Sequence, residues 1–452
     1  MSTSQETLRL LGEFESPNVT FMEPDGSWPI VWTRARGVHV WDAEGRCYLD
    51  LTAAFGVANA GHAAPRVVQA AQRQLARLPH AMGDVHPHPL KAQLARELSR
   101  ITFERWTGGA PEPQTGKTIF GNSGFEAVEA ALKTAMLATG KPGVIVFDGA
   151  YHGLGYGTLN TTHRDHFRGP FRRQLAEFGH FVAFPVSPAA EANRPTGRRF
   201  DRGASLDEVE SAIRRLCRRH RIGGILVEPV QGRGGIRVPP AAFLPLLRRL
   251  CDQAGLLLIV DEIYTGFGRT GRWFACEHSG TVPDLICLGK ALTGGFPLSA
   301  CVGRAEVMDA AWPKSTGEAI HTSTFLGHPV GCAMALAQMG EIARRRLVER
   351  SARLGSRLVE GLSAIQPPRP WRATARGLGL MAGLELRQSD GAPARTVALE
   401  AIKELLRRGF ILLPEGEAAN VISFTPPLTI TASQLDGSVS ALDEVLGGLT
   451  AS

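Results

Sequence analysis

The stretch LLLIVDEIYTGFGRTGRWFACEHSGTVPDLICLGK, residues 256–290, contains two short apolar runs that each lead to a charged side chain. The first run, residues 256–260, is followed by Asp261, and the second, residues 285–288, is followed by Lys290. Runs of Leu, Ile and Val without polar alternation are typical of strands that are buried on both faces of a sheet. A carboxylate and an amine after two such strands therefore predict a functional site at a sheet edge.

Predicted strands and helices alternate on both sides of this stretch, from about residue 117 to 329. Helices between strands imply a largely parallel α/β sheet. We expect strands within residues 117–124, 143–153, 223–232, 256–266 and 283–291, and helices within residues 125–140, 206–220 and 241–255.

The two ends of the chain show a different pattern. Near the start, residues 37–56 read as a hairpin in which Gly45 supplies the turn, and a helix follows at residues 64–78. After residue 331 the chain is helical at first, and short strands within 379–386 and 419–430 then flank a further helix. We expect a smaller α+β domain that takes in both ends.

Bulk composition excludes several classes of protein. No apolar run approaches the roughly 20 residues of a membrane span, and the N-terminus does not read as a signal peptide, so we expect a cytoplasmic protein without a membrane partner. The net charge is +7, but the basic residues are interspersed with acidic ones, so we expect no nucleic-acid partner. The seven cysteines form no CxxC pair and have no nearby histidine at ligand spacing, so we expect reduced thiols and no metal site.

Three groups in the α/β region form a set suited to one cofactor. Ser123, Gly124 and Phe125 connect a predicted strand to a helix, and a hydroxyl with free N–H groups at a helix N-terminus suits a phosphate. Asp261 ends an apolar strand, where a carboxylate requires a cationic partner. Lys290 is expected to be a desolvated amine that can bond a carbonyl carbon.

Each of these groups also has a purely structural interpretation. Ser123 could cap a helix, Asp261 could cap a loop, and Lys290 could reach the surface. Together they match pyridoxal 5′-phosphate (PLP), whose aldehyde forms a Schiff base with Lys290. Its phosphate then lies on the turn at residues 123–124, and its ring nitrogen pairs with Asp261.

The order of segments and motifs resembles the class III (ornithine/4-aminobutyrate type) aminotransferases of PLP fold type I. The resemblance extends from residue 37 to residue 430 and is strongest in VDEIYTGFGRTGRWFACEHSGTVPDLICLGKALTGGFPLSA, residues 260–300. It implies a large PLP-binding domain at residues 76–330, with a mostly parallel seven-stranded sheet between helices. The smaller α+β domain then comprises residues 1–75 and 331–452.

The same resemblance implies roles for individual residues. Lys290 and Asp261 bond the aldehyde and pair with the ring nitrogen, Ile263 packs under the ring, and Tyr151 stacks over it. His152 and Glu228 lie near the cofactor, and Thr324 reaches the phosphate of the neighbouring subunit, which implies a homodimer with shared active sites.

Three positions depart from the family pattern. Family members that use glutamate or 2-oxoglutarate carry an arginine at Ser423 and a glutamate at Arg233, and many have glutamine at Tyr264. Either Arg233 supplies a cation from another direction, or the substrate amine has no carboxylate beside it. We expect weak use of 2-oxoglutarate, and we expect Phe55 and Val85 to line the substrate site or to belong to the core.

These residues favour a PLP-dependent aminotransferase that moves an amino group between an amine or amino acid and a carbonyl acceptor. An amino-acid racemase, epimerase or aminomutase of the same fold is the alternative, because VISFTPPLTI without arginine also resembles racemases of this family. The segments GLGYG and QGRGG do not form the GxGxxG pattern of a nicotinamide dehydrogenase. A regulator without enzymatic activity would have little reason to keep both Lys290 and Asp261.

Overall fold

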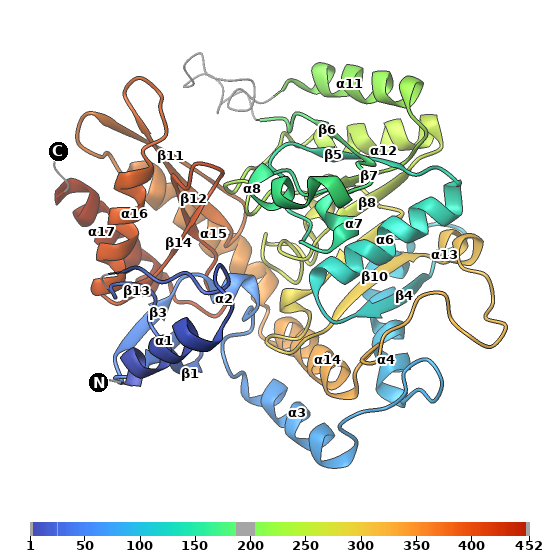
Figure 1. Ribbon diagram of the computed structural model, residues 1–452, viewed down its shortest axis with the longest axis horizontal. Helices are drawn as coiled ribbons and strands as arrows, with labels where there is room; N and C mark the ends of the chain where they lie inside the picture. Colours follow the sequence, from blue (N-terminus) through green and yellow to red (C-terminus); the bar gives the residue numbers. More distant parts are fainter. Residues whose placement is uncertain (1–2, 25, 187–203, 449–452) are drawn as a thin grey trace.

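A computed structural model describes residues 3–24, 26–186 and 204–448 of the chain, and its largest element is a seven-stranded sheet (Figure 1). The strand order is β4-β10-β9-β8-β7-β5-β6. Strand β10 runs antiparallel to its neighbours β4 and β9, and the other paired strands run parallel, which confirms the predicted fold class. The strands are β4 (Gly116–Gly121), β5 (Gly143–Phe147), β6 (Gly179–Val182), β7 (Ile222–Val227), β8 (Leu257–Asp261), β9 (Leu285–Leu288) and β10 (Ser299–Arg304). The alternating pattern did not predict β6 and β10.

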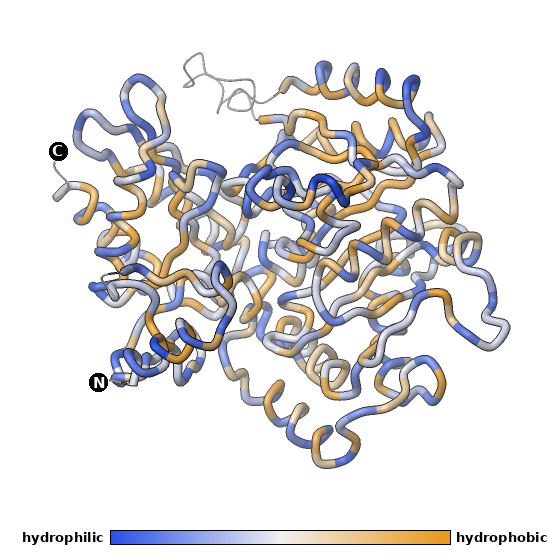
Figure 2. Tube along the Cα trace, viewed as in Figure 1, coloured by the Kyte–Doolittle hydropathy of each residue, from blue (hydrophilic) through white to orange (hydrophobic). Residues whose placement is uncertain are grey.

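Apolar side chains on both faces explain why these strands occupy the centre of the molecule. Every residue of β5, β7 and β9 is buried. Neighbouring residues of a strand point to opposite faces, so Ile259 belongs to the same apolar cluster as Val128 on helix α6 (Gly124–Thr139), whereas Val260 belongs to the cluster of Leu247 on helix α12 (Phe243–Ala254). The sheet is therefore covered by helices on both sides, and Figure 2 shows its strands as largely hydrophobic.

The register of β8 against β9 brings the two charged residues of the opening stretch together. Asp261 pairs with Cys287, three residues before Lys290. Because both strands run in the same direction, the loops after them leave the sheet at the same edge. Residues that are 29 positions apart in sequence thus become neighbours.

Two four-stranded sheets form the smaller part of the fold, on the left of Figure 1. One has the order β1-β2-β3-β13 and the other the order β11-β12-β15-β14. Strand β13 pairs parallel with β3, so the two ends of the chain share one sheet, and the predicted N-terminal hairpin is β2–β3. The strands are β1 (Trp32–Arg36), β2 (His39–Asp42), β3 (Cys47–Asp50), β11 (Trp371–Gly377), β12 (Ala382–Gln388), β13 (Phe410–Ile411), β14 (Leu413–Glu415) and β15 (Val421–Phe424). The sequence did not predict β1, β11, β13 or β14, and the domain boundaries at residues 75 and 330 stay predictions.

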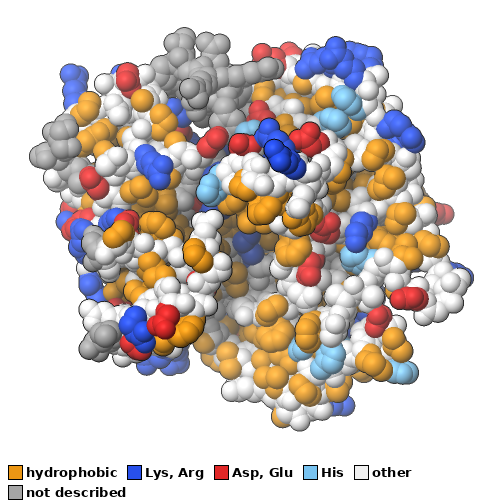
Figure 3. All heavy atoms as spheres, viewed as in Figure 1, with side chains coloured by type: hydrophobic (Ala, Val, Ile, Leu, Met, Phe, Trp, Pro, Cys, Tyr) orange, Lys and Arg blue, Asp and Glu red, His pale blue; other side chains and the backbone are white. Residues whose placement is uncertain are grey.

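The remaining helices surround these three sheets. Helix α11 (Leu206–Arg219) buries Val209 and Ile213 and turns its arginines outward, as its spacing predicts; these basic side chains gather at the upper right of Figure 3. None of the helices in the described part of the chain is long and apolar enough to cross a membrane. The others are α1 (Thr3–Phe14), α2 (Ala53–Gly56), α3 (Pro65–Arg77), α4 (Pro89–Ser99), α5 (Arg105–Thr107), α7 (Tyr156–Leu159), α8 (Asp165–Arg168), α13 (Ala305–Ala311), α14 (Pro329–Arg344), α15 (Leu347–Ala364), α16 (Arg395–Arg407) and α17 (Ala432–Gly448).

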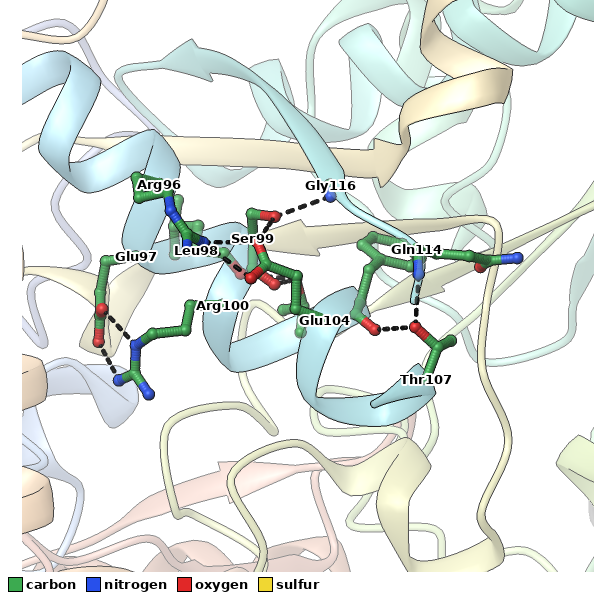
Figure 4. Close-up of polar contacts among 11 residues, drawn as sticks. Arg96, Glu97, Leu98, Ser99, Arg100, Glu104, Thr107, Gln114 and Gly116 are labelled. Carbon is green, nitrogen blue, oxygen red and sulfur yellow. Dashed lines mark hydrogen bonds and ion pairs between the residues drawn. The ribbon is translucent and has the colours of Figure 1, made fainter. Parts of the chain in front are cut away.

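A polar network fixes the start of β4, the strand that leads to the predicted phosphate site (Figure 4). Ser99, the last residue of α4, accepts a hydrogen bond from Gly116 N at 2.9 Å and donates to Glu104 at 2.5 Å. Glu104 also pairs with Arg96 at 2.6 Å. These contacts join α4, the segment at Glu104 and the first residue of β4. They therefore fix the position of β4, the strand that leads to Ser123.

Candidate active site

A cavity of about 570 Å³ lies at the carboxyl ends of the central strands. Its walls come from the loops after β4, β5, β7, β8 and β9 and from α2, which approaches from the smaller part of the fold. Figure 3 shows that the surface on this side is hollowed between the two parts of the molecule. The cavity is lined by Phe55, Ser123, Gly124, Phe125, Tyr151, His152, Gly153, Leu154, Glu228, Arg233, Asp261, Ile263, Tyr264, Thr265 and Lys290.

Lys290 is held in an unusual backbone conformation after β9. Its φ is +42°, a left-handed value that a residue with a Cβ adopts only where the surrounding structure enforces it. Burial lowers the pKa of the Lys290 amine, while Asp261, Glu228 and Glu415 act in the opposite direction. Its Nζ lies 4.8 Å from the centre of the Tyr264 ring. The result is a desolvated amine directed along one wall of the cavity.

Asp261 contacts a histidine in the structure, and its expected pairing with the cofactor ring nitrogen stays a prediction. Asp261 Oδ2 lies 2.7 Å from His152 Nδ1, and Oδ1 accepts a hydrogen bond from Ile263 N at 3.1 Å. An ionised carboxylate can only accept, so Nδ1 of His152 carries the hydrogen in this pair. His152 Nε2 is buried and has no hydrogen-bond partner among the described residues. The sequence placed His152 in this region but gave no sign of its bond to Asp261.

The turn between β4 and α6 is closed by an acid of the helix itself. The Glu126 carboxylate accepts a hydrogen bond from Ser123 N at 2.8 Å and another from Asn122 N. The N–H groups of the following residues, Gly124 and Phe125, belong to the first turn of the helix, where no intrahelical acceptor exists. A Cβ on Gly124 would lie 3.0 Å from Ile263, so the lack of a side chain lets α6 approach the loop after β8 closely.

Glu228 fixes the loops on both sides of the cavity. It is buried at the end of β7 and accepts hydrogen bonds from Tyr151 N at 3.0 Å and from Gly232 N at 3.1 Å. Burial, with Asp261 nearby, raises the pKa of Glu228 to about 7, although His152 opposes the shift. Glu228 therefore positions Tyr151, whose own ring packs edge-on against Phe167 at 5.5 Å.

The substrate residues expected from the sequence are not all at the cavity. Arg233 lines it, and its Nε lies 3.7 Å from Oε2 of Glu415, a residue 2% exposed at the end of β14. Burial raises the pKa of Glu415 to about 7, against the opposing effect of Arg233. Ser423 does not line the cavity, because it is buried on β15 and donates to Leu413 O at 3.0 Å. The sequence gave no signal for Glu415, since its contact with Arg233 depends on how β14 lies behind the loop after β7.

Three further predicted residues have different positions. Phe55 lines the cavity and is 51% exposed. Val85 is 63% exposed and is absent from the lining, so it belongs neither to this wall nor to the core. Thr324 is exposed and also absent from the lining, and its expected contact with a neighbouring subunit stays a prediction. Tyr264 lines the cavity, and its hydroxyl lies 3.2 Å from Thr425 Oγ1.

The seven cysteines are unpaired thiols in the structure. Across residues 3–24, 26–186 and 204–448, no group of three or more His, Cys, Asp or Glu side chains is arranged to hold a metal ion.

Comparison with known proteins gives a consistent result. Residues 21–446 match the family described as aminotransferase class-III. The 5-aminovalerate aminotransferase DavT of Pseudomonas aeruginosa is 38% identical over 92% of this chain and 93% of its own length. The 4-aminobutyrate aminotransferase GabT of Escherichia coli is 36% identical over 90% of this chain and 91% of its own length.

A solved structure of similar fold also reports a cofactor. The ornithine aminotransferase of Toxoplasma gondii, described with partial occupancy of PLP at the active site, matches with a TM-score of 0.82 and 26% identity. The match covers 98% of this chain and 94% of that one.

Proposed function

Because the chain belongs to the class-III aminotransferases, a PLP-dependent family, we propose that the cavity described above is its active site and that Lys290 bonds the PLP aldehyde. The chain is accordingly a PLP-dependent aminotransferase. The relatives and solved structures of similar fold are aminotransferases, so the racemase, epimerase and aminomutase alternative is not favoured. The observation that carries the assignment of the site is that the desolvated Lys290 amine shares one cavity with the Asp261–His152 pair and the N-terminus of α6.

The residues of the cavity fit PLP by their chemistry. An amine, a buried acid and free N–H groups at a helix start match an aldehyde, a pyridine nitrogen and a phosphate. Ser123, Gly124 and Phe125 hold the phosphate in this proposal. Ile263 and Tyr151, which both line the cavity, would hold the ring between them.

When bound, PLP supplies an aldehyde that takes up the amino group and a ring that stabilises negative charge on the substrate carbon. Lys290 has a lowered pKa, so its amine is neutral more often than that of an exposed lysine and can take a proton from that carbon. Asp261 keeps a lone pair free on each oxygen after binding His152 and Ile263 N–H, so it would accept a hydrogen bond from a protonated ring nitrogen.

The Lys290 assignment has a direct test. The protein is incubated with PLP, treated with borohydride, digested and analysed by mass spectrometry. We expect the pyridoxyl phosphate group on the peptide that contains Lys290, and we expect Lys290→Ala to lose both this label and activity. Lys133→Ala, which changes an exposed lysine on α6, is the matched control and keeps both. A label that persists in the Lys290→Ala variant would place the reactive amine elsewhere.

For substrates, we propose that Arg233 contacts a carboxylate of one substrate from a direction different from that of the usual family arginine. Arg233 is the only arginine that lines the cavity among the described residues, and it already faces the Glu415 carboxylate. A dicarboxylate such as 2-oxoglutarate needs two cationic contacts, whereas a monocarboxylate needs one. We therefore expect pyruvate to be a better acceptor than 2-oxoglutarate.

A panel of amines scored against pyruvate, 2-oxoglutarate and benzaldehyde tests both the reaction and the acceptor. Turnover is expected only when an acceptor is present, and pyruvate is expected to exceed 2-oxoglutarate in kcat/KM. Loss of optical rotation of an amino acid without any acceptor would support racemisation instead. Efficient turnover with 2-oxoglutarate would contradict the role given to Arg233.

We also propose a homodimer with shared sites and a cytoplasmic location. The segment at residues 78–85 lies against the segment at residues 320–326. Thr322 donates a hydrogen bond to Asp84, and Gly83 is close to Leu326 O. Both carry exposed apolar side chains, which supports a subunit contact near Thr324; they are Leu78, Met82, Val85, Ile320 and Phe325. Light scattering of the purified protein tests the dimer, and cell fractionation tests the location.

A further inference from the structure

The turn that carries Phe55 has a backbone that ordinary residues avoid. Ala53, Ala54, Phe55 and Gly56 have φ values of 47°, 49°, 62° and 76°. Gly56 N donates to Thr52 O at 2.9 Å and Val57 N donates to Ala53 O at 2.8 Å, so the segment forms one left-handed helical turn. Residues with a Cβ enter this region as single residues and seldom in succession, because each one is strained.

Buried polar contacts hold this turn in place. Asp50 is fully buried, and its carboxylate accepts hydrogen bonds from Thr52 N at 2.8 Å, from Thr52 Oγ1 at 2.6 Å and from Ala54 N at 3.2 Å. The same carboxylate lies 2.7 Å from His62 Nε2. Strain of this kind persists only where several contacts enforce it, and it is concentrated at functional sites.

The turn also packs against Tyr264, which lines the cavity. A Cβ on Gly56 would lie 2.4 Å from Tyr264 Cε2, so the backbone passes directly over the Tyr264 ring. Tyr264 and Phe55 both line the cavity. The left-handed conformation therefore decides where the Phe55 ring stands relative to the reacting groups.

Two other exposed apolar side chains line the same cavity as Phe55. Phe125, on the first turn of α6, is 37% exposed, and Leu154, in the loop after β5, is 46% exposed. Phe125 packs closely on the backbone of that loop, since a Cβ on Gly153 or Gly155 would lie 2.3 or 2.7 Å from it. We call Phe55, Phe125 and Leu154 the apolar rim. Exposed apolar groups that gather at a cavity mark a binding surface.

We propose that the left-handed turn at residues 53–56 is a specificity element, which holds Phe55 in the apolar rim so that the rim binds the apolar chain of the amine substrate. Phe55 is then a specificity-determining residue, and Thr52 and Ala54 are positioning residues that act through it. The inference rests on the proposed function, because it assumes that the amine enters this cavity. It adds a substrate class: primary amines with an extended alkyl chain.

The experiment compares propylamine and hexylamine as donors to pyruvate, with PLP-loaded protein. For the wild type we expect kcat/KM to rise with chain length, mainly through a lower KM, because the rim binds the chain equally before and during the reaction. In Phe55→Ala the ratio of the two kcat/KM values should fall by about fivefold or more, the size expected for losing part of the burial of three methylene groups.

Two substitutions at one position test the turn itself. Ala54→Gly allows the left-handed conformation and should keep the wild-type ratio, whereas Ala54→Val disfavours it and should reproduce the ratio of Phe55→Ala. Thr52→Val removes the hydroxyl that joins Asp50 to the turn and should shift the ratio in the same direction, which provides a second variant if the first does not fold. Phe55→Leu should restore most of the preference for hexylamine.

The outcomes separate the two proposals. If the wild type converts no amine with any acceptor, the proposed function fails. If it converts other donors but not alkylamines, or if Phe55→Ala keeps the wild-type ratio, the rim does not bind the chain. If the turn variants fold and keep the ratio while Phe55→Ala loses it, the turn is not the positioning element. A change of oligomeric state without a change of ratio would make Phe55 a subunit contact.

Discussion

Replacement of Glu415 by glutamine tests the electrostatics of the site most directly. Because the Glu415 carboxyl is buried, its ionisation lowers the stability of the native protein. The pKa of Glu415 rises from 4.5 to about 7 on folding. Below pH 4.5 the carboxyl is protonated in both states. Between pH 4.5 and 7 the unfolded chain releases its proton while the native protein keeps it, so native stability falls as the pH rises. The full loss is about 3 kcal/mol, at about 1.4 kcal/mol per pH unit.

Glutamine has the same shape but no proton to release. The unfolding free energy of Glu415→Gln minus that of the wild type should therefore increase by about 2 kcal/mol between pH 5.5 and pH 8.5. Urea unfolding followed by circular dichroism measures both proteins at one fixed PLP concentration, because ligand binding adds its own stability. Glu360→Gln, at an exposed position on α15, is the control and should give a difference that does not vary with pH.

The same substitution removes the carboxylate that lies beside Arg233. Without the carboxylate at 3.7 Å, Arg233 is free to contact a substrate carboxylate, so the KM for pyruvate at pH 8.5 should fall while that for benzaldehyde stays the same. A stability difference that is flat or that decreases with pH would refute the reasoning about Glu415. An unchanged KM for pyruvate would refute its link to Arg233.

Three further perturbations follow from the contacts of the site and the core. Asp261→Asn replaces the carboxylate beside His152 with an amide and should lower kcat by roughly 100-fold, because the ring nitrogen would then lose the acid that favours its protonated form. Absorbance should show that PLP is still bound, and an active variant would exclude Asp261 as the ring partner. Gly124→Val places atoms against Ile263 and should weaken PLP binding, measured by equilibrium titration, whereas Gly140→Ala at the open end of α6 should not. Leu258→Ala, fully buried in β8, should lower the unfolding free energy by about 2–5 kcal/mol in a urea titration, and a smaller loss would indicate that the core relaxes around it.

The sequence predicted those parts of the fold and site that depend on local pattern. Apolar strands before Asp261 and Lys290 define the parallel sheet, and its edge brings the two side chains together because strand direction alone determines which ends are neighbours. The turn at Ser123 follows for the same reason. The sequence did not predict strand β10, because this strand is antiparallel to β9 and no helix of the alternating pattern separates the two strands.

The rest of the site depends on contacts between distant segments. The His152–Asp261 bond joins residues 109 positions apart, and the Arg233–Glu415 pair brings β14 behind the loop after β7. Neither contact produces a periodic pattern in the sequence, so neither was predicted from it. Residue propensities do not predict the left-handed turn at residues 53–56 either, since two alanines and a phenylalanine are ordinary residues for a right-handed helix or a strand. The contacts of the buried Asp50 and of Thr52 help to hold the left-handed conformation.

The parallel pairing of β3 with β13 places a constraint on biosynthesis. Leu49 and Asp50 pair in register with Phe410 and Ile411, and the ladder hydrogen bonds run from Leu49 N to Gly409 O and from Leu51 N to Ile411 O, so β3 lacks this neighbour until residues 409–411 have left the ribosome. At about 5–20 residues per second this wait lasts on the order of 20–70 seconds, during which the seven-stranded sheet can already assemble. The sheet that contains this hairpin, next to Asp50 and the Phe55 turn, can then be completed only after the strands of the large sheet have been made. A translating chain thus acquires its central scaffold before it acquires the wall that selects substrates.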